Sequence, residues 1–174
     1  MSGDFSLIIK NGSCFIEGKL KNVDIGLSGN KIKKIGKIDL NTAKVLDASN
    51  KIVLPGVIDT QVHFREPGSI DTEDLESGSK AAVLGGITSV FEMPNTNPPT
   101  STLAEFDKKI KLAKNRMHSN YAFYFGATPE NSDQLSKLKN LEGCCGVKLF
   151  AGSSTGKLLV DKESDIEKVI SKSD

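Results

Sequence analysis

The sequence predicts an α/β protein with a small all-β part followed by a larger part in which strands and helices alternate. Three observations support this class. The 174 residues are 37% hydrophobic and 26% charged, which is typical of a folded globular chain. The first fifty residues contain short apolar segments separated by Gly and Asn turns. After them, a strand, a loop and a helix follow one another four times. We expect the first part to cover residues 1–54 and the second part residues 55–174.

The all-β part is indicated by apolar segments that end at turn residues. Asn11-Gly12 is a dipeptide typical of a two-residue β-hairpin turn, and Ser28-Gly29-Asn30 marks another turn. The segments between such turns predict short antiparallel strands over residues 7–10, 14–16, 23–27, 31–36 and 44–47. Residues 52–56 then lead into the second part.

The second part has the pattern of four strand and helix units. Asp71 or Thr72 is the expected N-cap of the first helix, because both side chains can accept a backbone hydrogen bond. Successive units of this kind form a parallel sheet with right-handed crossovers. The predicted strands cover residues 57–63, 88–93, 121–126 and 147–150. The predicted helices cover residues 73–85, 103–117, 133–141 and 162–170.

Charge and apolar patterning exclude several classes of protein. The 23 Lys and Arg residues against 22 Asp and Glu residues give a net charge of +1, so no basic face for nucleic acid is expected. The apolar stretches are only a few residues long, well below the ~20 needed to span a bilayer. We therefore expect neither a nucleic-acid nor a membrane partner. The lysines of the second predicted helix are expected on its solvated face: Lys108, Lys109, Lys111 and Lys114.

Cysteine usage and the first residues point to the cytoplasm. The chain has three cysteines, an odd number, and two of them are adjacent at Cys144 and Cys145. Such a set does not form a disulfide framework, and it fits a reducing compartment. The first residues lack the long apolar segment of a secretion signal. We therefore expect a cytoplasmic protein with free thiols.

Polar side chains follow the predicted strands of the second part. Gln61 and His63 are two residues apart at the end of the first strand, so they point to the same side. Asn95 follows the second strand in a loop stiffened by prolines, and Lys148 lies in the fourth strand. Arg65 is one of only two arginines, and its planar guanidinium suits bidentate recognition of an anion. Because parallel strands end at one edge of a sheet, we expect these side chains to share one site.

The second part contains five spaced motifs: PGVIDTQVHFREPG (55–68), EDLESG (73–78), GGIT (85–88), MPNTNPP (93–99) and GVKLF (146–150). These motifs closely resemble those of the dihydroorotases, which belong to the amidohydrolase superfamily. The resemblance implies a TIM-type (β/α)8 barrel that carries a small β-sandwich. On this interpretation the first part belongs to the sandwich, and the second part supplies the first four βα units of the barrel. A hydantoinase or an allantoinase is a weaker alternative, because the loops at 64–67 and 93–96 resemble the dihydroorotase forms.

The resemblance also implies a reaction and roles for individual residues. The reaction is the zinc-assisted, reversible hydrolysis of dihydroorotate to N-carbamoyl-L-aspartate in pyrimidine biosynthesis. Arg65 and Asn95 match residues that bind the substrate's carboxylate. His63 matches a zinc ligand, and Lys148 matches a lysine that in many members is carbamylated and bridges two metals. Gln61 stands where the family has another His ligand, and a neutral amide is a poor ligand for zinc.

The family's remaining His ligands and its catalytic Asp come from later strands of the barrel, so no catalytic residue is assigned in this sequence. We therefore expect a dihydroorotase-like chain that represents an N-terminal portion and is inactive alone. Its expected partners are the small-molecule substrate, a second half-barrel chain or another copy of itself. Two alternatives stay open: a non-catalytic scaffold partner of aspartate carbamoyltransferase, as is known in the family, and a decaying gene remnant.

Overall fold

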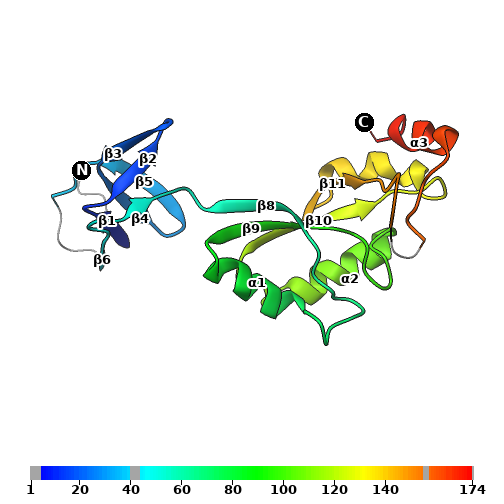
Figure 1. Ribbon diagram of the computed structural model, residues 1–174, viewed down its shortest axis with the longest axis horizontal. Helices are drawn as coiled ribbons and strands as arrows, with labels where there is room; N and C mark the ends of the chain where they lie inside the picture. Colours follow the sequence, from blue (N-terminus) through cyan, green and yellow to red (C-terminus); the bar gives the residue numbers. More distant parts are fainter. Residues whose placement is uncertain (1–4, 40–43, 155–156, 174) are drawn as a thin grey trace. The chain divides into compact units, whose positions relative to one another are not determined.

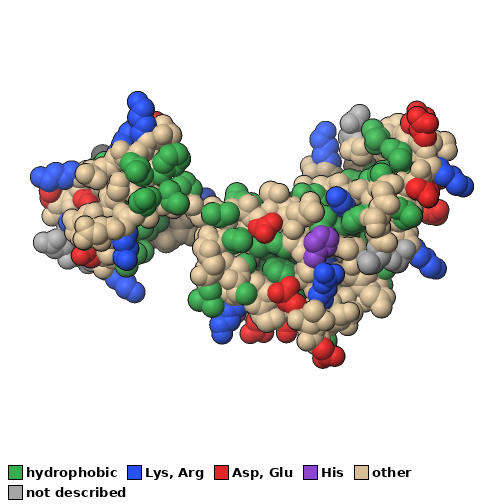
Figure 2. All heavy atoms as spheres, viewed as in Figure 1, with side chains coloured by type: hydrophobic (Ala, Val, Ile, Leu, Met, Phe, Trp, Pro, Cys, Tyr) green, Lys and Arg blue, Asp and Glu red, His purple; other side chains and the backbone are tan. Residues whose placement is uncertain are grey.

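A computed structural model describes residues 5–39, 44–154 and 157–173 of the chain (Figure 1). The chain divides into two compact units, residues 1–55 and residues 56–174. In the view of Figure 2, acidic and basic side chains are mixed over the surface and are not gathered by sign. This distribution agrees with the net charge of +1. Among the described residues, no helix is long and apolar enough to cross a membrane.

The first unit contains two small sheets. A four-stranded sheet has the order β5-β4-β1-β6, and a three-stranded sheet has the order β3-β2-β7. The side chains of Ile8, Ile25 and Ile38 are buried and form part of its core. The strands are β1 (Leu7–Lys10), β2 (Ser13–Ile16), β3 (Lys19–Asn22), β4 (Asp24–Ser28), β5 (Lys31–Gly36), β6 (Lys44–Asp47) and β7 (Ile52–Val53).

Three features of the first unit differ from the prediction, the first being β3, which none of the predicted strands covers. The strand β6 pairs with β1 in parallel, and β7 pairs with β2 in parallel, so antiparallel pairing throughout is wrong. The strands β1 and β2 belong to different sheets, so Asn11-Gly12 does not close a hairpin between them. A Cβ atom on Gly12 would lie 2.7 Å from Val53 Cγ2, so glycine is needed here for close packing against β7. A turn dipeptide is a local signal, and it does not decide which strands pair.

The second unit is built on a four-stranded parallel sheet with the order β11-β10-β9-β8. The parallel pairing of strands joined by helices confirms the predicted α/β class. Helices α1 (Leu75–Leu84) and α2 (Leu103–Ala113) lie on one face of this sheet (Figure 1). In the described residues the sheet is open, with β8 and β11 at its edges. The strands are β8 (Val57–Val62), β9 (Ile87–Glu92), β10 (Asn120–Gly126) and β11 (Cys144–Lys148).

The start of α1 is set by a capping box. The Asp74 side chain accepts a hydrogen bond of 2.6 Å from Ser77 N, and Ser77 Oγ accepts one of 3.2 Å from Asp74 N. Asp74 is therefore the N-cap, and the expectation that Asp71 or Thr72 has this role is wrong. The two-way hydrogen bonding with the residue three positions later favours Asp74 over the earlier candidates.

Other elements differ from the prediction at their ends. The helix α2 ends at Ala113 and not at Met117, because Asn115 takes a left-handed φ of 63° that a helix does not continue through. The last strand, β11, begins earlier than the predicted range 147–150, and Gly146 with a φ of 152° interrupts its regular alternation. The remaining helical segments are the 3-10 helix η1 (Ser132–Asn140) and α3 (Glu163–Ile170).

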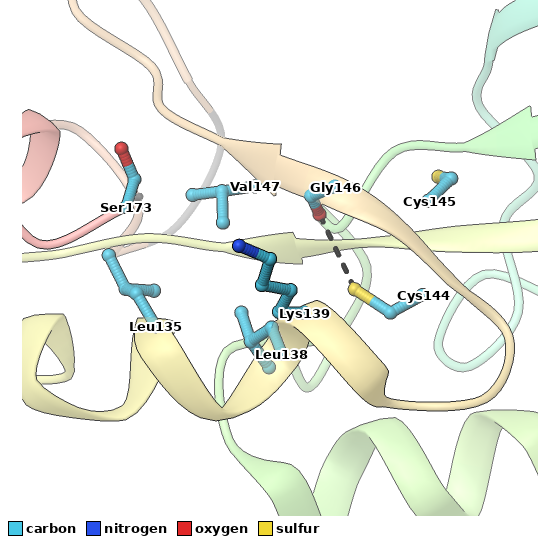
Figure 3. A pocket seen from close by; sticks show the side chains of 8 residues that line it. All are labelled: Leu135, Leu138, Lys139, Cys144, Cys145, Gly146, Val147 and Ser173. Carbon is cyan, nitrogen blue, oxygen red and sulfur yellow. Dashed lines mark hydrogen bonds between the residues drawn. The ribbon is translucent and has the colours of Figure 1, made fainter.

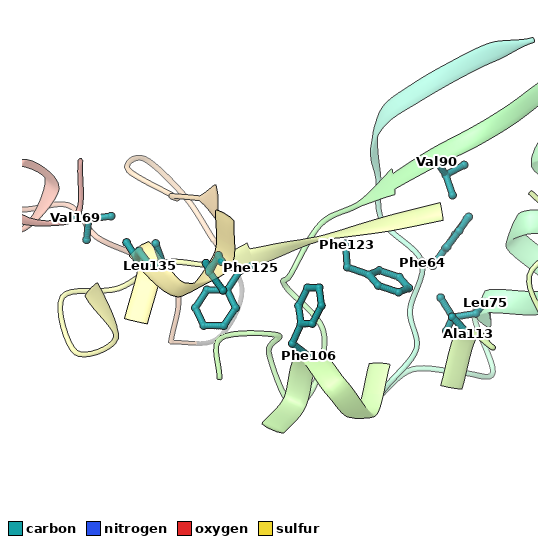
Figure 4. Close-up of a cluster of buried hydrophobic side chains, with 11 residues drawn as sticks. Phe64, Leu75, Val90, Phe106, Ala113, Phe123, Phe125, Leu135 and Val169 are labelled. Atoms are coloured by element: carbon teal, nitrogen blue, oxygen red, sulfur yellow. The ribbon is translucent and has the colours of Figure 1, made fainter. Parts of the chain in front are cut away.

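The core of the second unit lies between the sheet and its helices (Figure 4). Phe106 of α2 meets Phe123 of β10 edge to face, with ring centroids 6.4 Å apart, and Phe125 is fully buried on the same side. Because successive side chains of a strand alternate between faces, Phe91 and Tyr124 lie on the opposite face of the sheet. Their rings also meet edge to face at 6.4 Å. On the face opposite α1 and α2, the described residues thus include an aromatic pair formed by the sheet's own side chains.

Candidate functional site

Two of the predicted site residues meet where β8 and β9 end. His63 follows β8, Asn95 follows β9, and His63 Nδ1 lies 2.9 Å from Asn95 Oδ1. Both side chains are half-buried. Met93 N donates to Val62 O over 2.9 Å and joins the two strand ends beside this contact. Because the amide oxygen of Asn95 can only accept, Nδ1 of His63 is the donor in this hydrogen bond, and Nε2 is not part of it.

Arg65 and Asn95 also line one cavity of about 580 Å³ at these strand ends. Its charged lining residues, Arg65 and Lys157, are both basic. A cavity with two cationic side chains, two amides and two hydroxyl groups suits a small ligand that carries a negative charge. The full lining is Arg65, Pro67, Ser69, Asn95, Thr96, Asn97, Pro99 and Lys157.

Backbone hydrogen bonds hold the two loops around the cavity together. Asn97 N donates to Pro67 O over 3.0 Å, which joins the loop after β9 to the loop after β8. Within the loop after β9, Thr96 N and Thr100 N both donate to Pro94 O at 2.9 Å. These bonds satisfy the polar backbone of a segment without regular structure, so the loop is ordered by its own contacts.

Lys148 and Gln61 lie at the same edge of the sheet but are not joined to His63. Lys148 ends β11, and its ammonium nitrogen lies 5.1 Å from the ring centroid of Phe150. The Gln61 side chain is exposed, and its backbone N donates to Asp59 Oδ1 over 2.9 Å. In the part of the chain that the structure describes, no hydrogen bond or ion pair links either residue to His63. The role of Lys148 as a metal ligand, and the replacement of a His ligand by Gln61, stay predictions.

The donor atoms at these strand ends can be compared with the zinc site that the resemblance implies. Across residues 5–39, 44–154 and 157–173, no group of three or more His, Cys, Asp or Glu side chains is placed to hold a metal ion. A catalytic zinc ion takes three protein ligands and a water. His63 offers one imidazole nitrogen, and an unmodified Lys148 is a cation that repels the metal. The described residues therefore do not form a zinc site by themselves, and we assign no step to a metal.

An ion pair behind the His63 loop was not expected from the sequence. Arg116 donates two hydrogen bonds to the buried Glu66 carboxylate, from Nη1 to Oε1 at 2.7 Å and from Nη2 to Oε2 at 3.0 Å. Leu75 N also donates to Glu66 Oε2 over 3.0 Å. The hydrogen bonds of Arg116 with the Glu66 carboxylate raise the pKa of Arg116 above its ordinary value. The one available signal was that Arg116 is the second of only two arginines.

A second buried ion pair corrects the interpretation of the lysine run. Lys109 Nζ lies 2.8 Å from Glu92 Oε2, and the two side chains are 1% and 0% exposed. The expectation that Lys109 is solvated is therefore wrong, although its neighbours Lys108 and Lys111 are exposed. Burial raises the pKa of Glu92 to about 7, and the attraction of Lys109 opposes this shift. Burial likewise lowers the pKa of Lys109.

The adjacent cysteines line a different cavity, of about 490 Å³, beside η1 (Figure 3). Cys144 Sγ donates to Gly146 O at 3.7 Å. Burial raises the pKa of both thiols, that of Cys145 to about 12. Because the thiolate is the reactive and metal-binding form, these raised pKa values make both thiols less reactive than exposed ones. They are separate from the cavity of Arg65 and Asn95.

Comparison with known proteins places these features in a family. The profile described as Amidohydrolase family matches residues 52–155. The sequence is 40% identical over 151 residues to an allantoinase from Escherichia coli K12, covering 86% of this chain and 33% of the allantoinase. The chain thus spans about a third of the length of the curated relatives it matches.

Solved structures of hydantoinases share the fold. An L-hydantoinase from Arthrobacter aurescens is 29% identical with a TM-score of 0.86, covering 95% of this chain and 38% of that one. A D-hydantoinase from a Thermus species is 27% identical with a TM-score of 0.79, covering 96% and 37%. These relatives are cyclic amidohydrolases and not dihydroorotases in particular, so they support the broader class. The profile match over more than half of the sequence shows that this chain belongs to the amidohydrolase family.

Proposed function

We propose that the chain carries the substrate-binding strand ends of a cyclic amidohydrolase whose ring substrate bears a carboxylate, as dihydroorotate does. The observation that carries this proposal is the cavity in which Arg65 and Lys157 are the charged lining residues, next to the contact of His63 with Asn95. A guanidinium binds a carboxylate through two parallel hydrogen bonds. The rings of allantoin and hydantoin carry no carboxylate, so they leave these cations without a partner.

The described residues account for binding and orientation of such a substrate. Arg65 and Asn95 hold the carboxylate and one ring edge, while the His63 ring, fixed through Nδ1, presents Nε2. Hydrolysis adds water across the ring amide and breaks its C–N bond, which gives N-carbamoyl-L-aspartate from dihydroorotate. Zinc ligation and proton transfer need more side chains than the described residues supply. We propose that further βα units, in the same or a second polypeptide, complete the barrel and this site.

An allantoinase-like activity is the second candidate, and the 40% identity to an allantoinase favours it. The two candidates differ in their dependence on Arg65. Ring opening of dihydroorotate should need its guanidinium, whereas ring opening of allantoin or hydantoin should depend on it far less, because these rings are neutral.

The test measures ring opening of dihydroorotate, allantoin and hydantoin in parallel, with the protein isolated from its natural source and supplied with zinc. We expect dihydroorotate to be the preferred substrate. The variant Arg65→Gln should lower kcat/KM for it by about 10- to 100-fold, the value of a charged hydrogen-bonded pair. Lys111→Gln removes an exposed lysine and should have no effect. Preference for allantoin or hydantoin, unchanged in Arg65→Gln, would contradict the proposal.

A non-catalytic role predicts a different outcome of the same preparation. A scaffold partner would copurify with aspartate carbamoyltransferase and would open none of the three rings. A gene remnant would neither open a ring nor give a cooperative unfolding transition. The activity measurement therefore distinguishes an enzyme from both alternatives. Copurification with aspartate carbamoyltransferase distinguishes the scaffold partner from the gene remnant.

A further inference from the structure

The loop that leads from β8 to α1 carries His63 and Arg65 but contains no helix or strand. Its position therefore depends on individual contacts. The two ends are fixed by the hydrogen bond of Met93 N with Val62 O and by the capping box at Asp74. Between these ends, Glu66 is the residue whose charged side chain is the most deeply buried, with 9% of it exposed.

The Glu66 carboxylate is held from two directions. The Arg116 guanidinium binds both of its oxygens, at 2.7 and 3.0 Å, in the side-by-side geometry of a bidentate pair. Leu75 N, at the first residue of α1, donates to the same carboxylate over 3.0 Å. One side chain thus ties the loop to the start of α1 and to the segment that follows α2.

The Arg116 guanidinium is itself fixed by further partners. Its Nη1 also donates to Leu112 O over 3.3 Å, in the last turn of α2. Asp74 Oδ2 lies 4.0 Å and Glu76 Oε2 lies 3.9 Å from its nitrogens. The guanidinium thus lies among three carboxylates, that of Glu66 in the loop and those of Asp74 and Glu76 at the start of α1. Together they hold it in one place.

Arg65 directly precedes Glu66, and only Arg65 of the two lines the cavity. We propose that Arg116 is a positioning residue for this site: by holding Glu66, it fixes the backbone at Arg65 and so directs the Arg65 guanidinium into the cavity. This inference rests on the proposed function in one respect, namely that Arg65 binds the carboxylate of the substrate. The contact of Arg116 with Glu66 does not depend on that function.

Loss of Arg116 has a specific consequence for kinetics. Without Arg116, the buried Glu66 carboxylate would have no cation beside it, which is unfavourable. The loop would therefore move until this carboxylate reaches water. Arg65 binds a carboxylate that does not react, so its contact is equally strong with bound substrate and in the transition state. A displaced Arg65 therefore raises KM and leaves kcat nearly unchanged. A general loss of folding would instead lower the amount of active protein and leave KM as it is.

The test compares Arg116→Gln, Arg116→Lys and the control Lys111→Gln, which removes an exposed lysine from α2. Amide hydrogen exchange in the full chain reports on the loop without any activity. We expect exchange of the Leu75 amide to become about tenfold faster or more in Arg116→Gln, since this amide donates to Glu66. Exchange over β10, residues 120–126, should stay as in the wild type. The exchange rate of the Leu75 amide in Arg116→Lys should lie between those of the wild type and Arg116→Gln.

The kinetic arm uses the same variants in the enzyme isolated as above, with dihydroorotate as substrate. We expect KM to rise about tenfold in Arg116→Gln, with kcat changed by less than about threefold, and no change in Lys111→Gln. Unchanged Leu75 exchange, or equal acceleration over β10, would overturn the positioning role. If the wild type opens no ring, the proposed function fails, and the exchange measurement alone decides the role of Arg116.

Discussion

The variant Lys109→Met tests the buried ion pair between β9 and α2. Lys109 Nζ lies 2.8 Å from Glu92 Oε2, and both side chains are almost fully buried. Among the described residues, neither carboxylate oxygen of Glu92 has a hydrogen-bond partner of good geometry. Methionine is unbranched and flexible like lysine but has no charge, so most of the packing is retained. The variant therefore isolates the effect of removing the ammonium from Glu92.

The size of the effect follows from the pKa of Glu92, which burial raises from 4.5 to about 7 against the attraction of Lys109. Between pH 4.5 and about pH 7, Glu92 holds a proton in the folded protein but has lost it in the unfolded chain, so stability falls as the pH rises. At about 1.36 kcal/mol per pKa unit, this shift lowers the unfolding free energy of the wild type by about 3 kcal/mol at pH 8. Without the ammonium, folded Glu92 stays protonated at pH 8, which adds about one more pKa unit, from 7 to 8. We expect Lys109→Met to lose about 1 kcal/mol at pH 8.

At pH 5 the same variant should lose no stability. Folded Glu92 is then mostly protonated with or without Lys109, and the buried ammonium of the wild type faces a neutral carboxyl group. Burial lowers the pKa of Lys109, so its charged form is itself unfavourable there. The assay is urea unfolding followed by far-UV circular dichroism at pH 5 and pH 8. The control Lys108→Met removes an exposed lysine and should change stability by less than about 0.5 kcal/mol at either pH.

The double variant Lys109→Met with Glu92→Gln completes the test. Removing both charges should restore most of the stability at pH 8, because no buried carboxyl group then has to be protonated. A loss of equal size at pH 5 and pH 8 would refute the reasoning, since it would show that packing and not charge is responsible. A double variant no more stable than Lys109→Met at pH 8 would refute it as well.

Three further predictions concern the cap, the packing and the thiols of the second unit. Asp74→Ala removes the N-cap of α1 and should cost about 1 kcal/mol in urea unfolding, whereas Asp71→Ala should cost less than about 0.5 kcal/mol. Gly78→Ala would place a Cβ atom 2.5 Å from a ring carbon of Phe64, so it should lower the unfolding free energy by about 1–3 kcal/mol despite the better helix propensity of alanine. The raised pKa of Cys145, about 12, should make alkylation by iodoacetamide at pH 8 more than about tenfold slower than in the urea-unfolded chain. Mass spectrometry measures this rate, and equally fast alkylation of the folded chain would contradict the prediction.

The position of His63 and Asn95 at one edge of the sheet was predictable, because it follows from topology alone. Both residues come directly after strands, and consecutive strands of βα units are parallel neighbours, so their ends meet. The contact of Glu66 with Arg116 was not predictable in this way. These residues are 50 positions apart, and Arg116 follows a helix and not a strand. No local pattern indicates which of the surrounding carboxylates an arginine in such a segment will bind.

The burial of Lys109 was visible in part from the helix period. Phe106 and Ala113 are the buried apolar residues of α2, and Lys109 lies between them on the same helical face. The neighbouring lysines concealed this signal, because a run of lysines is usually solvated. What the sequence lacked was the partner: Glu92 is the last residue of β9, and only the packing of α2 on the sheet brings the two together.

The two ion pairs together give α2 a role in the site that its sequence does not suggest. Glu66 follows β8 and Glu92 ends β9, and the charge of Glu66 contributes to the raised pKa of Glu92. Two such carboxylates can stay buried in their charged forms only when each has its own cation. Lys109 of α2 and Arg116 just after it supply these cations. Lys109 and Arg116 therefore neutralise the charges of Glu92 and Glu66. Arg65 and Lys157 are then left to set the charge of the cavity.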